Sequence, residues 1–195
     1  MQRVFHNLAR RCGRLPSMTW EEQLFAALDD LEQQAEALYD TDRAAELADR
    51  SRAEYGAVTL ASRLMASLDG ELVVTVIGVG RVAGRAQRLG TGWVLLHGSG
   101  GDWVVALAAI SSVHGASPRS VPEVAWSPLT RLGLGSALRR ISEAGERCLV
   151  HLRDGNRLDG RVLRVGADFA EVQLAPGRVE LVAFVALAAV QSRSG

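Results

Sequence analysis

Apolar residues near the start of the chain recur at steps of four and three, which is the period of one face of a helix. They are Leu24, Leu28, Leu31, Ala35 and Leu38. Thr19 and Glu22 precede them at the spacing of a capping box, in which each side chain accepts from the other residue's backbone amide. The pattern predicts a helix whose narrow apolar seam lies against one other helix.

Residues 40–42, Asp-Thr-Asp, interrupt this seam, and a second helical pattern runs from Leu47 to Tyr55. Two arrangements fit the interruption: a helical hairpin, or one long helix that pairs with a partner. Gly56 is expected to end the helical arm, because glycine readily takes the non-helical backbone of a helix end.

The pattern then changes to a short helix followed by strands, and this order occurs twice. In the first two strands of each round, apolar and polar residues alternate with the period of two that a half-buried strand requires, whereas residues 93–97 are an apolar run. The first round predicts a helix within 58–68 and strands at 71–77, 81–88, 93–97, 102–106 and 110–113. The second round predicts a helix at 136–144 and strands at 147–152, 157–165, 169–174, 178–184 and 188–191.

An internal repeat accounts for the two rounds. Residues 81–90 reappear as residues 157–166 at a constant offset of 76, with three arginines and two glycines in register. Gly84 and Gly160 fall in mid-strand, where a tightly curved sheet needs a residue without a side chain. We therefore expect two tandem units of the same fold.

The order within each unit is a helix, a strand, a turn, a strand with a mid-strand glycine, a third strand, a hairpin and a short closing strand. This order resembles the Sm-like small barrel, the fold of the LSm and Hfq proteins. The resemblance covers about residues 57–114 and 136–192. It implies an α+β protein in which an N-terminal helical arm is followed by two Sm-like five-stranded small β-barrels.

The chain then divides into five parts. They are a disordered basic extension at 1–17, an acidic helical arm at 18–56, a first barrel at 57–117, a Pro/Gly-rich linker at 118–135 and a second barrel at 136–195. Met18 directly precedes the predicted helix and is an alternative first residue to Met1. We call residues 57–117 the first repeat and residues 136–195 the second repeat.

Proteins of the Sm-like family bind RNA largely through an Asn in the third strand and a basic pair before the fifth. The second repeat has Ala170, or its neighbours Glu171 and Val172, at the first of these places and the apolar segment 184–187 at the second. The first repeat has Val94 and the segment 105–107, which are equally apolar. The resemblance therefore implies the barrel without the family's RNA site.

Charge is segregated along the chain, although its 22 basic and 22 acidic residues sum to zero. Every basic residue is arginine. Residues 1–17 hold four arginines and no acid, residues 18–55 eleven acids and three arginines, and residues 56–195 fifteen arginines and eleven acids. The acidic face of the arm is therefore either ordinary solvated surface or a docking surface for a basic protein partner.

Six arginines are candidates for nucleic-acid binding, because they recur in the repeat and their guanidinium groups can neutralise phosphates. They are Arg81, Arg85, Arg88, Arg157, Arg161 and Arg164. Trp93 or Phe169 could stack on bases if exposed. The alternative is that these arginines pair with acids such as Asp159 and Glu171 and keep the strand edges soluble.

Enzyme activity, a metal site and a cofactor are not expected. The four histidines are scattered, and no serine, cysteine and histidine are spaced to hold a nucleophile against a base. No apolar run approaches the roughly 18 residues that span a bilayer. Cys12 and Cys148 have no neighbours at metal-ligand spacing. These features favour a bacterial protein in a reduced cytoplasm.

Two functions remain open from the sequence, and a third, a small-molecule or enzyme role in a pocket between the barrels, would need a polar cleft that the sequence does not locate. One is a non-catalytic nucleic-acid-associated or regulatory interaction module that binds RNA or DNA. The other is a protein–protein scaffold or adaptor without nucleic acid, which uses the barrel edges and the seam of the arm, Leu24, Leu28, Leu31 and Leu38. Whether the arginines form one continuous face would separate the two, and unpaired strand edges would favour an oligomer.

Overall fold

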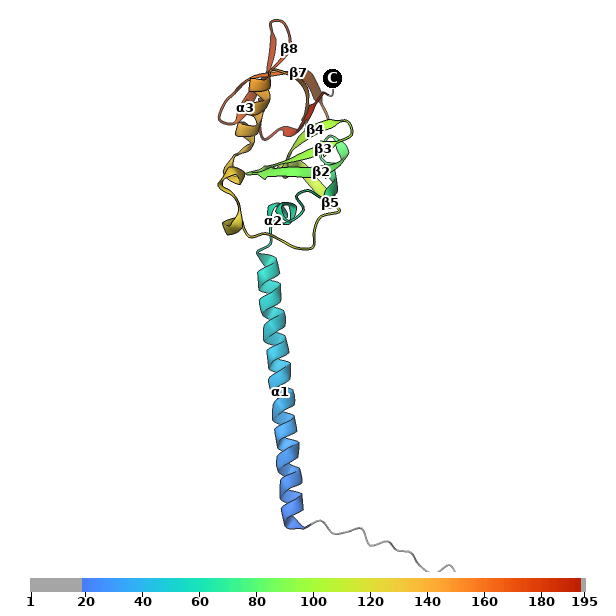
Figure 1. Ribbon diagram of the computed structural model, residues 1–195, viewed down its shortest axis with the longest axis vertical. Coiled ribbons are helices and arrows are strands. Elements are labelled where there is room, and N and C mark those ends of the chain that lie inside the picture. The colour runs from blue at the N-terminus through green and yellow to red at the C-terminus, as the bar shows by residue number, and fades with distance from the viewer. Residues whose placement is uncertain (1–18, 194–195) are drawn as a thin grey trace, which may run out of the picture. The chain divides into compact units, whose positions relative to one another are not determined.

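The computed structural model describes residues 19–193, apart from the side chains of residues 41 and 42. The chain divides into two compact units, with the boundary between Gly56 and Ala57. The N-terminal unit contributes one helix, and the C-terminal unit contains both repeats and all the strands (Figure 1).

The N-terminal helix α1 runs without a break from Trp20 to Gly56. The predicted capping box is confirmed: the amide of Thr19 donates to the Glu22 carboxylate at 2.8 Å, and the amide of Glu22 donates to the Thr19 hydroxyl at 3.4 Å. The hairpin alternative is wrong. Residues 21–55 contain no proline or glycine, so the three polar residues at 40–42 lower helix propensity without breaking the helix.

The first repeat begins with a short helix, α2 (Leu60–Met65), whose start is capped reciprocally by Thr59 and Ser62. Its strands agree with the predicted ones to within two residues at each end. They are β1 (Glu71–Val76), β2 (Gly80–Gly90), β3 (Trp93–Gly98), β4 (Gly101–Ala106) and β5 (Ile110–His114), with the 3-10 turn η1 (Leu107–Ala109) before β5.

The linker between the repeats is packed against the first repeat. It contains the 3-10 turns η2 (Glu123–Ala125) and η3 (Pro128–Arg131). The Trp126 ring packs on the core of the first repeat and donates to the Val121 carbonyl at 2.8 Å. Trp93 of β3 donates from its ring nitrogen to the carbonyl of Leu132 at 2.9 Å, which ties the end of the linker to the sheet.

The second repeat repeats the order of the first. Helix α3 (Leu134–Ala144) ends at Gly145, which takes a left-handed φ of 66° as a helix C-cap glycine does. Five strands follow, again close to the predicted ranges. They are β6 (Arg147–Leu152), β7 (Arg157–Val165), β8 (Phe169–Ala175), β9 (Arg178–Ala183) and β10 (Leu187–Ser192).

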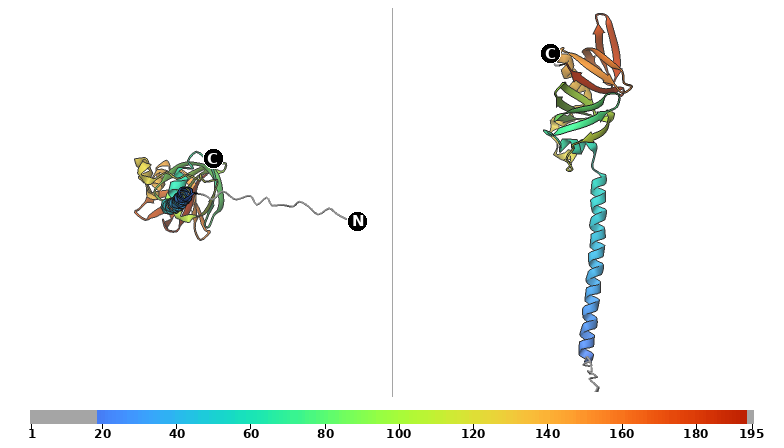
Figure 2. Two further views of the ribbon diagram at one scale, coloured as in Figure 1. Left: turned by 90° about the horizontal axis from the view of Figure 1, so that it is seen from below. Right: turned by 90° about the vertical axis from the view of Figure 1, so that its right-hand side faces the viewer.

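All ten strands belong to one antiparallel sheet in the order β5-β1-β2-β3-β4-β10-β6-β7-β8-β9 (Figure 2, green for the first repeat and orange to red for the second). The predicted α+β class with an N-terminal helix is confirmed. The two five-stranded barrels are not confirmed, because β4 pairs with β10 and joins the two repeats into one sheet that does not close.

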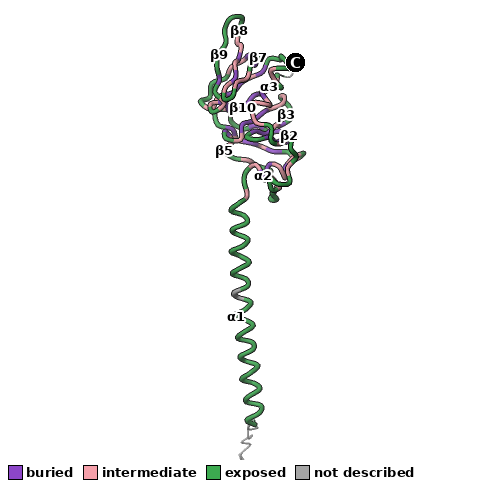
Figure 3. The backbone as a smooth tube through the Cα atoms, turned by 90° about the vertical axis from the view of Figure 1, so that its left-hand side faces the viewer, coloured by how far each residue is buried: buried purple, intermediate pink, exposed green. Residues whose placement is uncertain are grey.

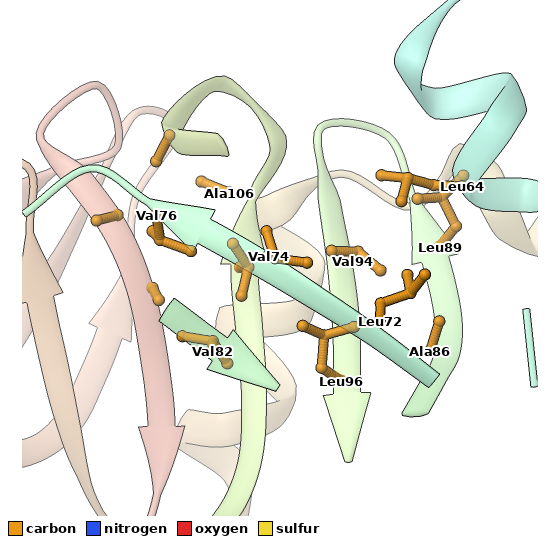
Figure 4. Close-up of a cluster of buried hydrophobic side chains, with 14 residues drawn as sticks. Leu64, Leu72, Val74, Val76, Val82, Ala86, Leu89, Val94, Leu96 and Ala106 are labelled. Atoms are coloured by element: carbon orange, nitrogen blue, oxygen red, sulfur yellow. The ribbon is translucent and has the colours of Figure 1, made fainter. Parts of the chain in front are cut away.

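The sheet covers two separate cores. Figure 4 shows the core of the first repeat, where Leu72, Val74 and Val94 lie among side chains from β1 to β4. The core of the second repeat contains Leu138 of α3 and apolar residues of β6 to β10. Ala189 belongs to the first core, while its neighbour Val190 belongs to the second. Strand β10 therefore contributes side chains to both cores.

The mid-strand glycines lie where the sheet backbones come too close for a side chain. A Cβ atom on Gly84 would lie 2.6 Å from the carbonyl oxygen of His97, and one on Gly160 would meet the carbonyl oxygen of Gln173 in the same way. Both strands carry a bulge two residues later, after Ala86 and after Val162. The repeats thus share their points of curvature.

We expect Gly160→Ala to lower the free energy of unfolding by about 1–3 kcal/mol, because the backbone of β8 must shift to admit the methyl group. Gly100→Ala is the matched control, since a Cβ there meets only the Gln191 amide nitrogen at 3.7 Å. Urea denaturation followed by circular dichroism measures both variants. Equal stability of the two would contradict the assigned close approach.

Candidate functional site

The junction between the repeats is an antiparallel pairing of β4 with β10. Val105, Val104 and Trp103 of β4 lie opposite Ala189, Val190 and Gln191 of β10, in that order. Side chains extend it: the Asp102 amide donates to the Ser192 hydroxyl at 2.7 Å, and the Gln191 amide donates to the Gly100 carbonyl at 3.0 Å. This pairing is the candidate functional site, because the strands at the two open edges of the sheet are the repeat counterparts of β4 and β10.

The junction contains buried apolar side chains. Val104 is 9% exposed and Val190 2%. Beside them, Trp103 of the first repeat stacks on His151 of the second, with ring centroids 5.1 Å apart. Burial of His151 lowers its pKa, against a hydrogen bond that the imidazole donates to the Gln191 side chain and that raises it. The imidazole therefore packs as a neutral ring between the repeats.

The sheet ends in two strands that are each paired on one side only. Strand β5 pairs with β1, and β9 pairs with β8. By the repeat, β5 corresponds to β10, and β9 corresponds to β4. The chain therefore presents, at its two open edges, the two strands whose counterparts form the internal junction.

The correspondence can be followed residue by residue from the strand register. Strand β5 pairs with β1 as β10 pairs with β6, and β9 pairs with β8 as β4 pairs with β3. Leu181 of β9 corresponds to Val104, yet it is 69% exposed where Val104 is 9% exposed. Ser112 of β5 corresponds to the fully buried Ala189, yet it is exposed. The greater exposure of Leu181 and Ser112 is expected, because β9 and β5 each lack a neighbouring strand on one side.

The six candidate arginines form two separate groups, three on β2 and three on β7, and all six are exposed. Five strand spacings separate β2 from β7 along the sheet, which is about 24 Å. Arg85 pairs with Glu71 at 3.5 Å, and Arg164 pairs with Glu171 at 2.8 Å. The arginines therefore do not make one continuous row across the sheet.

The apolar seam of α1 is exposed, as Figure 3 shows for the helix as a whole. Its predicted partner-binding residues are between 47% and 68% exposed. They are Leu24, Leu28, Leu31 and Leu38. No described residue covers this seam, although a helix surface of this kind is usually packed against another element.

Two aspects of the site were not foreseen from the sequence. Trp93, considered there as a base-stacking residue, is 6% exposed and presents no open ring face. The residues of the β4–β10 junction were not singled out. A signal was present, because at the repeat offset of 76 the polar Ser112 stands where the second repeat has the apolar Ala188, and a polar residue in place of an apolar one is typical of an edge strand.

The described residues were also compared with the requirements of a metal site and of a membrane-spanning helix. Residues 19–193 contain no group of three or more His, Cys, Asp or Glu side chains that could hold a metal ion. None of their helices combines the length and the apolar character needed to cross a bilayer. The Cys148 thiol is buried and unbonded, and burial raises its pKa to about 11.

Comparison with known proteins adds no constraint on function. No protein-family model matches the chain, and no curated protein matches it. The features of the chain that bear on function are therefore the two open edges, the arginine groups and the exposed seam.

We expect Cys148 to react slowly with iodoacetamide in the folded protein. At pH 8 a thiol with a pKa of about 11 holds about a hundredfold less thiolate than one at the ordinary value of 9.0. In a Cys12→Ser variant, where Cys148 is the one remaining thiol, intact-mass spectrometry should show alkylation at least a hundredfold slower in the folded protein than in urea. Equal rates in the two states would contradict the assigned burial.

Proposed function

We propose that the protein is a non-catalytic scaffold whose copies join head to tail, β9 of one chain to β5 of the next. The observation that carries this proposal is the internal β4–β10 junction, which pairs the counterparts of these two strands. An exposed edge strand with unpaired backbone groups is a template for strand addition. Here each copy carries both edges, so the β9 edge of one copy can pair with the β5 edge of another.

The register of the proposed contact follows from the internal junction. Val113 takes the place of Val190 and lies opposite Leu181, which takes the place of Val104. Ser112 then lies opposite Val182, and His114 opposite Glu180. Leu181 loses most of its exposed surface in this arrangement, and the apolar contact stabilises the pairing. The contact is heterologous, so successive copies form a ring if the rotation closes and a filament if it does not.

We also propose that each repeat is a small Sm-like barrel. Three features support it: the shared strand order, in which the fifth strand lies beside the first, the helix ahead of each sheet, and the equivalent glycines and bulges on β2 and β7. A reduced bacterial cytoplasm is the proposed setting, which suits the unbonded buried thiol of Cys148.

The assembly would carry one helix α1 on each chain. We propose that α1 is the arm through which the scaffold binds a basic protein partner. Its apolar seam is exposed, and the helix holds eleven acids against three arginines. A basic amphipathic helix would cover the seam and offset this charge.

We expect Leu181→Asp to reduce the wild-type oligomer to a single chain of 20.9 kDa, because the charge would be buried at the centre of the contact. Val179→Asp is the matched control on the same strand. Its counterpart in the internal junction is already an aspartate, Asp102, so this variant should still assemble. Sedimentation velocity over a range of protein concentrations measures both. Leu181→Asp that sediments like the wild type would contradict the proposal.

Mixing two defective variants tests the direction of the contact. Ser112→Glu places a charge on the β5 edge, where the counterpart Ala189 is fully buried, and leaves β9 intact. Each variant alone should be monomeric, whereas a mixture of Ser112→Glu with Leu181→Asp should form a 1:1 dimer and nothing larger. Larger species in the mixture would show that the copies associate through another surface.

Nucleic-acid binding is the second candidate function, and a specific observation favours it. Arg81, Arg88, Arg157 and Arg161 are exposed, and none of them forms a salt bridge with a described carboxylate. Head-to-tail assembly would repeat these groups at regular intervals, which would suit a phosphate backbone that follows the assembly.

If nucleic acid binds, its affinity should fall with salt, and the slope of log affinity against log salt should become shallower by about one for each phosphate contact removed. The variant replaces Arg81, Arg88, Arg157 and Arg161 by alanine. Arg140→Ala is the control, because Arg140 already pairs with Glu143 at 2.8 Å. Fluorescence anisotropy with labelled RNA and DNA measures the slopes. No binding at low salt would remove this candidate.

A further inference from the structure

A cavity of about 520 Å³ lies between the two repeats within one chain. One side is the outer surface of β2, β3 and β4, and the other is α3 with the adjoining ends of β6 and β10. A volume of this size is that of a typical small-molecule site. The cavity belongs to a single chain, so it does not depend on the proposed assembly.

The walls of the cavity are mostly apolar and come from both repeats. They include Trp93, Leu95, Val104, Ile141, Cys148 and Val190. The ring of Trp93 is held in place by its hydrogen bond to the Leu132 carbonyl. Because only 6% of Trp93 is exposed, it offers an apolar surface rather than an open face on which a base could stack.

The rim carries three cations and two anions. Two of the arginines already have carboxylate partners: Arg140 pairs with Glu143 at 2.8 Å, and Arg147 pairs with Asp159 at 3.0 Å. Arg88 is exposed, and no salt bridge joins it to any carboxylate of the described chain. It is therefore the guanidinium that a bound anion would meet.

Comparison of the repeats shows why Arg88 has no such partner. Its counterpart in the second repeat, Arg164, lies opposite Glu171 and forms a salt bridge with it at 2.8 Å. Arg88 lies opposite Leu95, which lines the cavity. At this one cross-strand position, the first repeat has an apolar wall where the second has a carboxylate. The same position thus supplies both an uncompensated cation and an apolar surface.

We propose that this cavity binds an anionic amphiphile, a molecule with an apolar body and a single carboxylate. The apolar body lies against Trp93, Leu95 and Val104, and its burial supplies most of the affinity. The carboxylate takes the position that Glu171 holds beside Arg164 and accepts hydrogen bonds from the planar guanidinium of Arg88. The ligand thereby replaces the missing half of an ion pair that the second repeat keeps intact.

Titration calorimetry of the full chain with sodium decanoate, below the concentration at which micelles form, tests the proposal. Arg88→Ala should weaken binding at least about tenfold, the size expected for one charge-assisted hydrogen-bonded contact. Arg81→Ala is the matched control, since Arg81 is also exposed and on β2 but does not line the cavity. Its affinity should equal that of the wild type.

Leu95→Glu is the second variant, because it recreates in the first repeat the pair that the second repeat already contains. It should fold normally and lose decanoate binding, since the new carboxylate occupies Arg88. Decan-1-ol, which lacks the charge, should bind the wild type about tenfold more weakly than decanoate and should not respond to Arg88→Ala. No saturable binding of decanoate, or equal affinity in wild type, Arg88→Ala and Leu95→Glu, would overturn the proposal.

Discussion

The hydrogen-bonded pairing of β4 with β10 is the constraint on which the rest of the C-terminal unit depends. It joins the last strand of the chain to the fourth strand of the first repeat, so the sheet cannot be completed until both repeats have formed. Because Ala189 and Val190 face different cores, the same strand completes both. The pairing also brings the outer surface of β2–β4 beside α3, which creates the cavity between the repeats.

The two repeats are informative where they differ. Shared features, such as the glycines of β2 and β7, report what the fold requires of the backbone. Positions that differ report what each copy does with the same scaffold. The first repeat has Leu95 on an apolar wall where the second has Glu171 in an ion pair. It has Ser112 on an open edge where the second has Ala189 in an interior strand. A duplicated chain thus contains an internal control for each of its own sites.

Local structure was predictable from the sequence, whereas the way the elements combine was not. Apolar or alternating runs bounded by turn residues located the ten strands, and the spacing of Thr19 and Glu22 located the start of α1, because these signals are local in the chain. The β4–β10 pairing joins segments far apart in sequence, and no local pattern specifies it. Trp93 is buried and donates to the linker carbonyl of Leu132, a long-range contact that its aromatic character alone could not indicate.

The internal junction differs from an intermolecular one in a way that follows from the covalent linker. Within the chain, the linker holds β4 and β10 at a fixed effective concentration, so their pairing does not weaken on dilution. A contact between chains obeys mass action and forms only when enough protein is present. In an edge-to-edge assembly of repeats, duplication therefore places every second contact between repeats within one chain, where its formation is unimolecular. The number of repeats in any such assembly is always even, and the amount of protein determines how many chains it contains.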